Sequence, residues 1–335
     1  MPHARELVHD QLTVSMEVAD LNVMPRTWWR PLAPAMALVV ALAACRDDPP
    51  ARGNDTAATG APPPAVPEPP TAAPITWDTS AGLFFALVGE SPSSATLIDA
   101  RYGSGDQLDT LRPGPGIDAL EFELFAGGDS AGVARIVSIA GVTAAQCAGW
   151  PRVQVAAVSP ETPVRAWRVA FPRGRVTALP WDSLPRLSAA DSARLTVAIA
   201  RAASRVEGDT AAAFRGRPFV VRQANRVGAD HRFVFAEVVR TVQQEANPLQ
   251  EQMLLVLEQT DEEREGFRTV YHQRAITLEE HLESVELIAA LRINATGVPA
   301  LLLRRDSEQG TAFVLLERGA DGTWYQRWRS PPATC

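Results

Sequence analysis

The sequence contains no lysine, and all 32 of its basic residues are arginine. This absence excludes a Schiff-base lysine and the lysine of a phosphate-binding P-loop. The 39 acidic residues outnumber the arginines and give the chain a net charge of −7 at neutral pH. Because binding to nucleic acid requires a basic surface, we expect no nucleic-acid partner.

The apolar run from Pro31 to Leu42 is too short to cross a bilayer as a helix, which takes about 20 residues. Its length is instead typical of the core of a signal peptide. Arg26 and Arg30 supply the positive flank that such a core needs. The run therefore predicts export of the protein.

The run ends in Leu42-Ala43-Ala44-Cys45, which resembles the lipobox of bacterial lipoproteins. The resemblance implies that a diacylglyceryl group is attached to the Cys45 sulfur and that the peptide is cut just before this residue. It thus implies a signal peptide over residues 1–44 and a mature protein held at a membrane by its N-terminal lipid. The order of positive flank, apolar core, small residues and cysteine favours this interpretation over a buried helix that ends in a cysteine.

Residues before and after the predicted signal peptide indicate where translation begins and which membrane holds the protein. Four acidic residues within Met1–Val23 are foreign to a signal peptide, so we expect translation to begin at Met24. Arg46 follows the cysteine at the position where aspartate retains enteric lipoproteins in the inner membrane. By resemblance to that rule, we expect the outer membrane, facing the periplasm, although Asp47 comes one place later. Residues 45–76 are rich in proline and alanine and predict an extended spacer.

Residues 77–180 alternate between short apolar runs and turn signals, which predicts an N-terminal β region. Gly89–Pro92 and Gly127–Ser130 mark two hairpins, and two further strands follow around Ser159-Pro160. The predicted strands lie at 82–88, 94–102, 117–126, 132–142, 152–159 and 164–171.

Residues 181–216 are expected to form a helical connection. Ser188 and Asp191 have the spacing of a capping box, and Gly208 is typical of a helix end. The apolar residues between them recur at helical spacing and are Leu195, Ala198, Ile199, Ala202 and Val206. We predict one long helix from Ser188 to Val206.

Residues 217–335 predict a C-terminal β region made of two successive four-strand units. The strands lie at 217–224, 231–242, 251–259 and 266–275, and then at 284–294, 298–306, 311–319 and 323–330. The whole chain is therefore expected to be mainly β, built from antiparallel meanders, with one long helix between the two β regions. The spacing fits either a propeller-like arrangement or two packed β units.

Residues 284–330 resemble a blade of the FG-GAP type in one detail. In that family a D-x-D-G-D-G loop between two strands binds calcium, whereas here Asn294 and Thr296 replace carboxylates and only Gly297 keeps its place. A hard cation needs several oxygen ligands with enough negative charge. The resemblance therefore implies a loop that has lost its metal.

The mature part has only three histidines, His231, His272 and His281, and none belongs to a zinc-protease, serine-elbow or Cys-His motif. We therefore expect no catalytic motif, no cofactor and no metal. The nearest approach to a metal site is Glu280, His281 and Glu283. These residues either hold a transition metal or form a short solvated charged segment.

Trp324 and Trp328 alternate on one predicted strand and are expected to lie on the same face. Exposed, they would form a stacking platform for sugars such as the glycan of peptidoglycan. Buried, they would belong to the sheet core, which is the favoured interpretation because large aromatic residues on an alternating strand usually face inward.

Three functions from different classes remain open. The favoured one is a lipid-anchored, non-catalytic binding or scaffolding module of the cell envelope, with an envelope protein or glycan as partner. The second is a hydrolase of envelope polymers that uses dispersed carboxylates such as Glu121, Glu123 or Glu237, because carboxylate pairs assemble in space. The third is a structural subunit of a larger envelope complex.

Once Cys45 is lipidated, Cys147 and Cys335 remain as an even pair in an oxidising compartment, and we predict a disulfide between them. The alternatives are a buried Cys147 with a free terminal thiol, or an intermolecular bridge. The bond would close a very long loop and stabilise the fold by at most about 4–5 kcal/mol. Peptide mapping of the unreduced, lipid-free protein should find the 147–335 crosslink. Two alkylatable thiols in the unreduced, denatured protein would contradict it.

Overall fold

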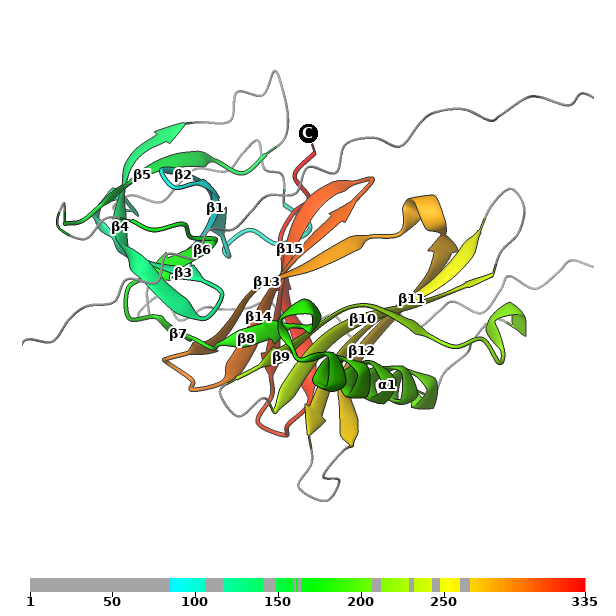
Figure 1. The fold of residues 1–335 in the computed structure, drawn as a ribbon. Helices are drawn as coiled ribbons and strands as arrows, with labels where there is room; N and C mark the ends of the chain where they lie inside the picture. The colour runs from blue at the N-terminus through cyan, green and yellow to red at the C-terminus, as the bar shows by residue number, and fades with distance from the viewer. Residues whose placement is uncertain are drawn as a thin grey trace, which may run out of the picture. The chain divides into compact units, whose positions relative to one another are not determined.

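Antiparallel strands make up most of the part of the chain that the computed structural model describes (Figure 1). The described residues are 85–106, 117–140, 149–159, 161, 164–206, 212–228, 232–242, 248–259 and 266–334, all within the compact unit Pro67–Cys335. The predicted signal peptide, lipidation site and spacer at residues 1–76 lie outside them, as do His231, Cys147 and Cys335. Among the described residues, no helix combines the length and the apolar character that crossing a membrane requires.

Six strands of the N-terminal region close into a barrel. They are β1 (Phe85–Ser91), β2 (Ser94–Asp99), β3 (Glu121–Ala126), β4 (Asp129–Ala140), β5 (Arg152–Ala157) and β6 (Val169–Pro172), and a short 3-10 helix, η3 (Ile117–Ala119), precedes β3. Their order is β1-β2-β5-β4-β3-β6. The two predicted hairpins are present as β1–β2 and β3–β4. The strands around Ser159-Pro160 are not neighbours, because β6 closes the barrel between β1 and β3.

The C-terminal region forms two five-stranded sheets. The first sheet holds β9 (Val220–Val227), β10 (Phe233–Val242), β11 (Leu249–Gln259) and β12 (Phe267–Leu278). The second sheet holds β13 (Ser284–Ile293), β14 (Pro299–Ser307), β15 (Gly310–Arg318) and β16 (Trp324–Arg329). Both four-strand units are antiparallel meanders, which confirms the predicted mainly β class.

Each sheet gains a fifth strand from the segment that leaves the barrel. β7 (Val176–Ala178) pairs with β13 in the second sheet, and β8 (Trp181–Ser183) pairs with β9 in the first. Both strands have three residues, too few to show an alternating pattern in the sequence. The segment between barrel and helix thus joins both sheets.

The two sheets pack face to face. Of the two arrangements that the sequence predicted, the structure therefore has the packed β units and not the propeller-like one. Phe235 and Leu254 of the first sheet share one apolar cluster with Leu287, Leu301 and Val314 of the second. The outer face of the second sheet packs on the barrel through a cluster that includes Phe171 and Leu302. Because the sheets are covered on both faces, their central strands are continuous apolar runs rather than alternating ones.

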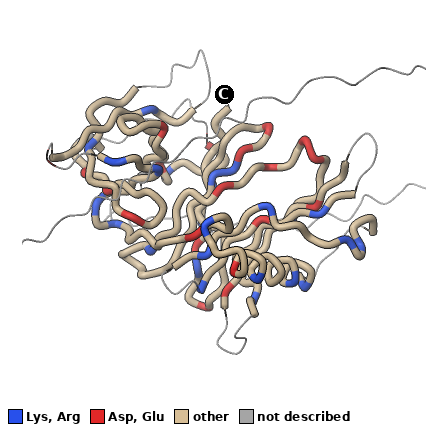
Figure 2. The backbone as a smooth tube through the Cα atoms, in the orientation of Figure 1, with Lys and Arg blue, Asp and Glu red and all other residues tan. Residues whose placement is uncertain are grey.

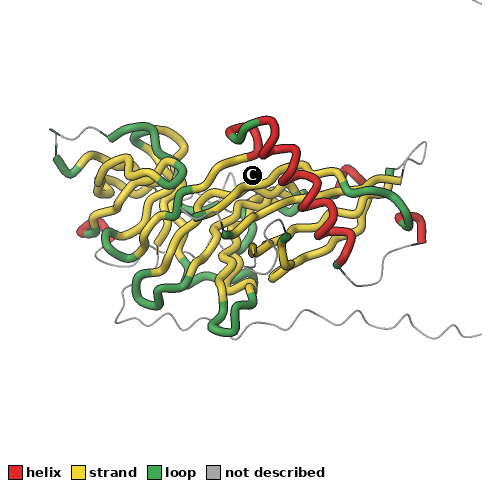
Figure 3. The backbone as a smooth tube through the Cα atoms, turned by 60° about the horizontal axis from the view of Figure 1, so that its bottom comes forward, coloured by secondary structure: helices red, strands yellow, loops and turns green. Residues whose placement is uncertain are grey.

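The outer face of the first sheet is covered by helix α1 (Ala189–Arg205), which lies across its strands in Figure 3. Ser188 caps the helix and accepts a hydrogen bond from the backbone N–H of Asp191 at 3.1 Å, as predicted. The Ser188 hydroxyl and then Arg194 lower the pKa of Asp191. Leu195, Ile199 and Ala202 are buried against the sheet. Three further 3-10 turns are η4 (Leu184–Arg186), η5 (Ala212–Phe214) and η6 (Glu279–His281).

Trp150 and Ala333 lie close in sequence to the two cysteines of the predicted disulfide. Both pack on the apolar cluster between the barrel and the second sheet. Ala333 is also held by backbone hydrogen bonds to Thr311 at 2.8 and 2.9 Å. Trp150 and Ala333 therefore reach the same part of the core.

Candidate functional site

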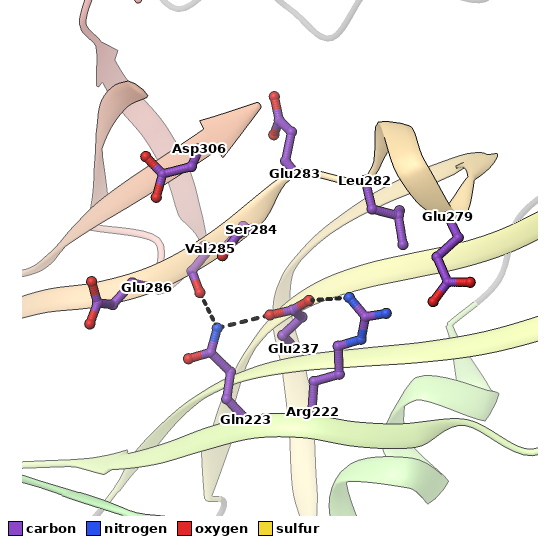
Figure 4. Close-up of a pocket in the computed structure, with 10 residues that line it drawn as sticks. All are labelled: Arg222, Gln223, Glu237, Glu279, Leu282, Glu283, Ser284, Val285, Glu286 and Asp306. Carbon is purple, nitrogen blue, oxygen red and sulfur yellow. Dashed lines mark hydrogen bonds and ion pairs between the residues drawn. The ribbon is translucent and has the colours of Figure 1, made fainter. Parts of the chain in front are cut away.

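A polar cleft of about 560 Å³ opens where the first and second sheets meet, and we call it the Glu237 cleft (Figure 4). The first sheet supplies Arg222 and Gln223 from β9 and Glu237 from β10. The other wall consists of Glu279 of η6, the stretch Leu282–Glu286 that leads into β13, and Asp306 of β14. Acidic side chains dominate this lining, with Arg222 as its basic residue.

Glu237 lies at the centre of the cleft and is only 4% exposed. Its carboxylate accepts hydrogen bonds from the side-chain amides of Gln223 at 2.9 Å and Gln252 at 2.8 Å. Arg222 adds an ion pair at 3.7 Å. A buried carboxylate is stable only with such partners, because transfer out of water removes its hydration.

The two glutamines also connect the sheets. The amide of Gln223 donates to the backbone carbonyl of Val285, and that of Gln252 donates to the carbonyl of Glu283 at 2.8 Å. Each amide therefore bonds to Glu237 of the first sheet and to the chain that begins the second. Glu237 orients both amides and so fixes the position of β13 at the edge of the cleft.

Glu283 forms ion pairs with two arginines of the second sheet. Its carboxylate pairs with Arg305 and, at 3.3 Å, with Arg329. Burial lowers the pKa of the Arg305 guanidinium, whereas the Glu283 carboxylate acts in the opposite direction. Arg305 also donates to the side-chain carbonyl of Gln273 at 2.8 Å. The carboxylate of Glu283 is thus already neutralised by cations.

Of the predicted metal candidates, His281 and Glu280 contact each other, whereas Glu283 has other partners. His281 Nδ1 lies 2.6 Å from a carboxylate oxygen of Glu308, and Glu280 lies 3.6 Å from the other ring nitrogen. Glu283 bonds to arginines instead. Among the described residues, no group of three or more His, Cys, Asp or Glu side chains is arranged to hold a metal ion.

At the rim of the cleft, most carboxylates have a cation beside them. Glu286 pairs with Arg168 of the barrel region, and Asp306 pairs with Arg304 at 3.0 Å. Glu279 on η6 is exposed and has no ion-pair partner among the described residues. Glu279 is therefore the rim carboxylate that is available to a ligand.

Of the dispersed carboxylates that the sequence indicated, only Glu237 lines the cleft. Glu121 lies on β3 of the barrel and pairs with Arg173 at 2.7 Å, and Glu123 lies on the same strand. Sequence reasoning missed Gln223 and Gln252. Their only signal was the presence of polar residues inside strands that are otherwise apolar.

The expectation that Trp324 and Trp328 share one face is wrong. The register shifts between Leu315 and Leu316, opposite β16, so that one residue of β16 is extra and the two indoles point to opposite faces. Trp324 is 5% exposed and packs between the sheets, whereas Trp328 is 8% exposed and packs toward the barrel. Both are core residues, and no exposed sugar platform forms there.

No family model matches this chain, and neither a curated protein nor a solved structure matches it significantly. The candidate site therefore rests on its own residues and their chemistry.

A second polar cluster lies on the helix-covered face of the first sheet. Glu251 of β11 is fully buried between two arginines, Arg240 of β10 at 2.7 Å and Arg274 of β12 at 3.1 Å. Arg240 also donates to the backbone carbonyl of Phe214 at 3.1 Å and lies over the ring of Phe219, 4.4 Å from its centroid. One carboxylate thus holds two guanidinium groups that are themselves largely buried.

We predict that Glu251→Gln lowers the free energy of unfolding by about 3–5 kcal/mol, because it removes the buried carboxylate that pairs with two largely buried arginines. Urea unfolding of the full chain, followed by tryptophan fluorescence, measures this loss. The control is Glu308→Gln at an exposed position, which should cost less than about 0.5 kcal/mol. Equal losses for the two variants would contradict the prediction.

Proposed function

We propose that this protein is a lipid-anchored, non-catalytic binding module of the bacterial cell envelope and that the Glu237 cleft holds its ligand. The observation that carries the proposal is the buried Glu237 carboxylate, held by two oriented amides in an open polar cleft. Fixed polar groups in a concave site are typical of specific ligand binding. The lipobox pattern ending at Cys45 supports the envelope location.

The chemistry of the cleft favours a hydroxyl- and amide-bearing polymer, and we propose an envelope glycan. Carboxylates accept hydrogen bonds from hydroxyl and amide N–H groups, and Arg222 donates to acceptors. A binding role is favoured over hydrolysis because the carboxylates of Glu237 and Glu283 are already bonded to amides and arginines. Hydrolysis by Glu237 together with a rim carboxylate such as Glu279 is the second candidate, since both line one cleft.

The proposal includes two covalent modifications, a lipid on Cys45 and a disulfide between Cys147 and Cys335. Cys45 carries the lipid, residues 45–76 form the spacer, and Arg46 directs the protein to the outer membrane. The proposed Cys147–Cys335 disulfide is supported by Trp150 and Ala333, which pack on one cluster. The bond would tie the C-terminal residue to the barrel region.

We predict that Cys45→Ser abolishes membrane anchoring, because only a thiol can carry the thioether-linked lipid. The full chain should move from the membrane fraction to a soluble or uncleaved, mislocalised form. Density-gradient separation of the wild-type membranes should place the protein with the outer membrane. Unchanged membrane fractionation of the serine variant would refute the lipidation site, and recovery of the wild type with inner membranes would refute the choice of membrane.

We predict that the full chain sediments with purified peptidoglycan sacculi and that Glu279→Lys reduces the bound fraction by about tenfold. The expected size corresponds to the loss of one charge-assisted hydrogen bond at the cleft rim. Glu280→Lys is the matched control, because it makes the same change one residue away, outside the cleft lining.

Sedimentation that is absent, or equally reduced by both variants, would overturn the proposed glycan ligand. The same samples are assayed for soluble glycan fragments. Their release by the wild type, and loss of this release in Glu237→Gln, would favour the hydrolase.

A further inference from the structure

Two opposite charges line the Glu237 cleft without pairing with each other. Arg222 on β9 and Glu279 on η6 both belong to its lining, and the Glu279 side chain points from η6 toward Arg222 (Figure 4). Among the described residues, no ion pair joins these two. The carboxylate that pairs with Arg222 is that of Glu237, at 3.7 Å. A ligand in the cleft can therefore contact both charges.

The Arg222 guanidinium is oriented by two buried residues of the first sheet. One of its nitrogens donates to the side-chain carbonyl of Gln250 at 2.8 Å, and another lies 3.7 Å from a carboxylate oxygen of Glu237. Gln250 is only 3% exposed, whereas the Arg222 side chain is 38% exposed. Because a guanidinium has five N–H donors, these contacts leave donors for a ligand. Its planar fork matches the two oxygens of a carboxylate.

Glu279 supplies the complementary charge. It is exposed on η6, and among the described residues it is the carboxylate of the cleft lining without an ion-pair partner. A carboxylate of this kind forms charge-assisted hydrogen bonds with an ammonium group. The cleft thus offers one position for an anionic group and one for a cationic group.

The charges of the cleft balance once the ion-pair partners of its lining are included. The five lining carboxylates are Glu237, Glu279, Glu283, Glu286 and Asp306. The arginines beside them also number five: Arg222 in the lining and the partners Arg168, Arg304, Arg305 and Arg329. This balance favours a ligand without net charge, because a simple cation would leave Arg222 unused and a simple anion would leave Glu279 unused.

We propose that the Glu237 cleft binds a free amino-acid end, which is an ammonium and a carboxylate group on one carbon atom. Arg222 binds the carboxylate and Glu279 binds the ammonium. The inference rests on the proposed function, which makes this cleft the ligand site. It adds that the part of peptidoglycan bound there is a stem peptide, because stem peptides present such ends on the glycan strands.

Isothermal titration of the full chain in a nonionic detergent tests the inference with three matched probes. Meso-diaminopimelate has a free amino-acid end at each terminus, pimelate keeps its carboxylates without the amines, and cadaverine keeps its amines without the carboxylates. Diaminopimelate should bind at least about tenfold more tightly than either control, because each control loses one charge-assisted contact. Equal affinity for either control, or no binding of diaminopimelate up to about 10 mM, would overturn the inference.

Glu279→Gln and Arg222→Gln should each weaken the binding of diaminopimelate by about tenfold. The matched controls are Glu280→Gln and Arg201→Gln, which make the same changes at exposed positions outside the cleft lining. They should leave the affinity within about twofold, because solvent screens charges at that distance. Equal weakening by variants and controls would show general charge attraction and overturn the site.

Sedimentation with two kinds of sacculi separates this inference from the proposed glycan ligand. Intact sacculi should bind the full chain, and sacculi stripped of their stem peptides by an amidase should not. Equal sedimentation with both kinds would overturn the inference and leave the glycan ligand in place. Binding of diaminopimelate without sedimentation of either kind would overturn the glycan ligand and leave the amino-acid site in place.

Discussion

Face-to-face packing of the two five-stranded sheets is the constraint on which the rest of this structure depends. Phe235 and Leu254 on one side and Leu301 and Val314 on the other form a shared apolar layer. Each sheet then buries its second face as well, against α1 or against the barrel. Burial on both faces leaves little solvent-exposed surface for polar side chains in the central strands, so those present need hydrogen-bond or ion-pair partners within the protein.

The polar clusters of the first sheet follow directly from this constraint. Gln250, Glu251 and Gln252 are consecutive on β11 and all buried. Because side chains alternate along a strand, Glu251 faces the helix and joins Arg240 and Arg274 there, whereas Gln252 faces the second sheet and joins Glu237. One short polar segment of β11 thus supplies an ion-pair partner on the helix-covered face of the first sheet and a hydrogen-bond partner on the face toward the second sheet.

Elsewhere, basic and acidic residues are interspersed along the backbone (Figure 2).

Local signals were enough to predict much of the fold. The capping box at Ser188 and Asp191 and the apolar spacing after it located α1, and turn residues located the hairpins of both β regions. The closed barrel, β7 and β8 could not be predicted, because they depend on pairing between residues far apart in sequence. The faces of Trp324 and Trp328 were mispredicted for a related reason, since a one-residue bulge reverses the alternation.

In the candidate site, too, local sequence signals predicted one part, and the rest depends on pairing between strands. Glu237 could be named from the sequence as a carboxylate within an apolar strand, but its partners depend on register. Gln223 lies directly opposite it on β9, beside a shift in the pairing, and Gln252 is two positions along on β11. A slip of one residue in either pairing would move these amides to the other face. The cleft is therefore a product of strand alignment rather than of any local motif.

The two three-residue strands β7 and β8 have a consequence for how the chain can be divided. Only Leu179 and Pro180 separate them, and both take part in bonding: Leu179 donates to the carbonyl of Ala290, and the carbonyl of Pro180 accepts from Gly228. This short stretch thus supplies the edge strand of both sheets, β7 beside β13 and β8 beside β9. A fragment starting beyond Pro180 would leave the edge of β13 unprotected and open to pairing with other chains. The short segment between the barrel and α1 thus protects the two sheets against edge-to-edge association.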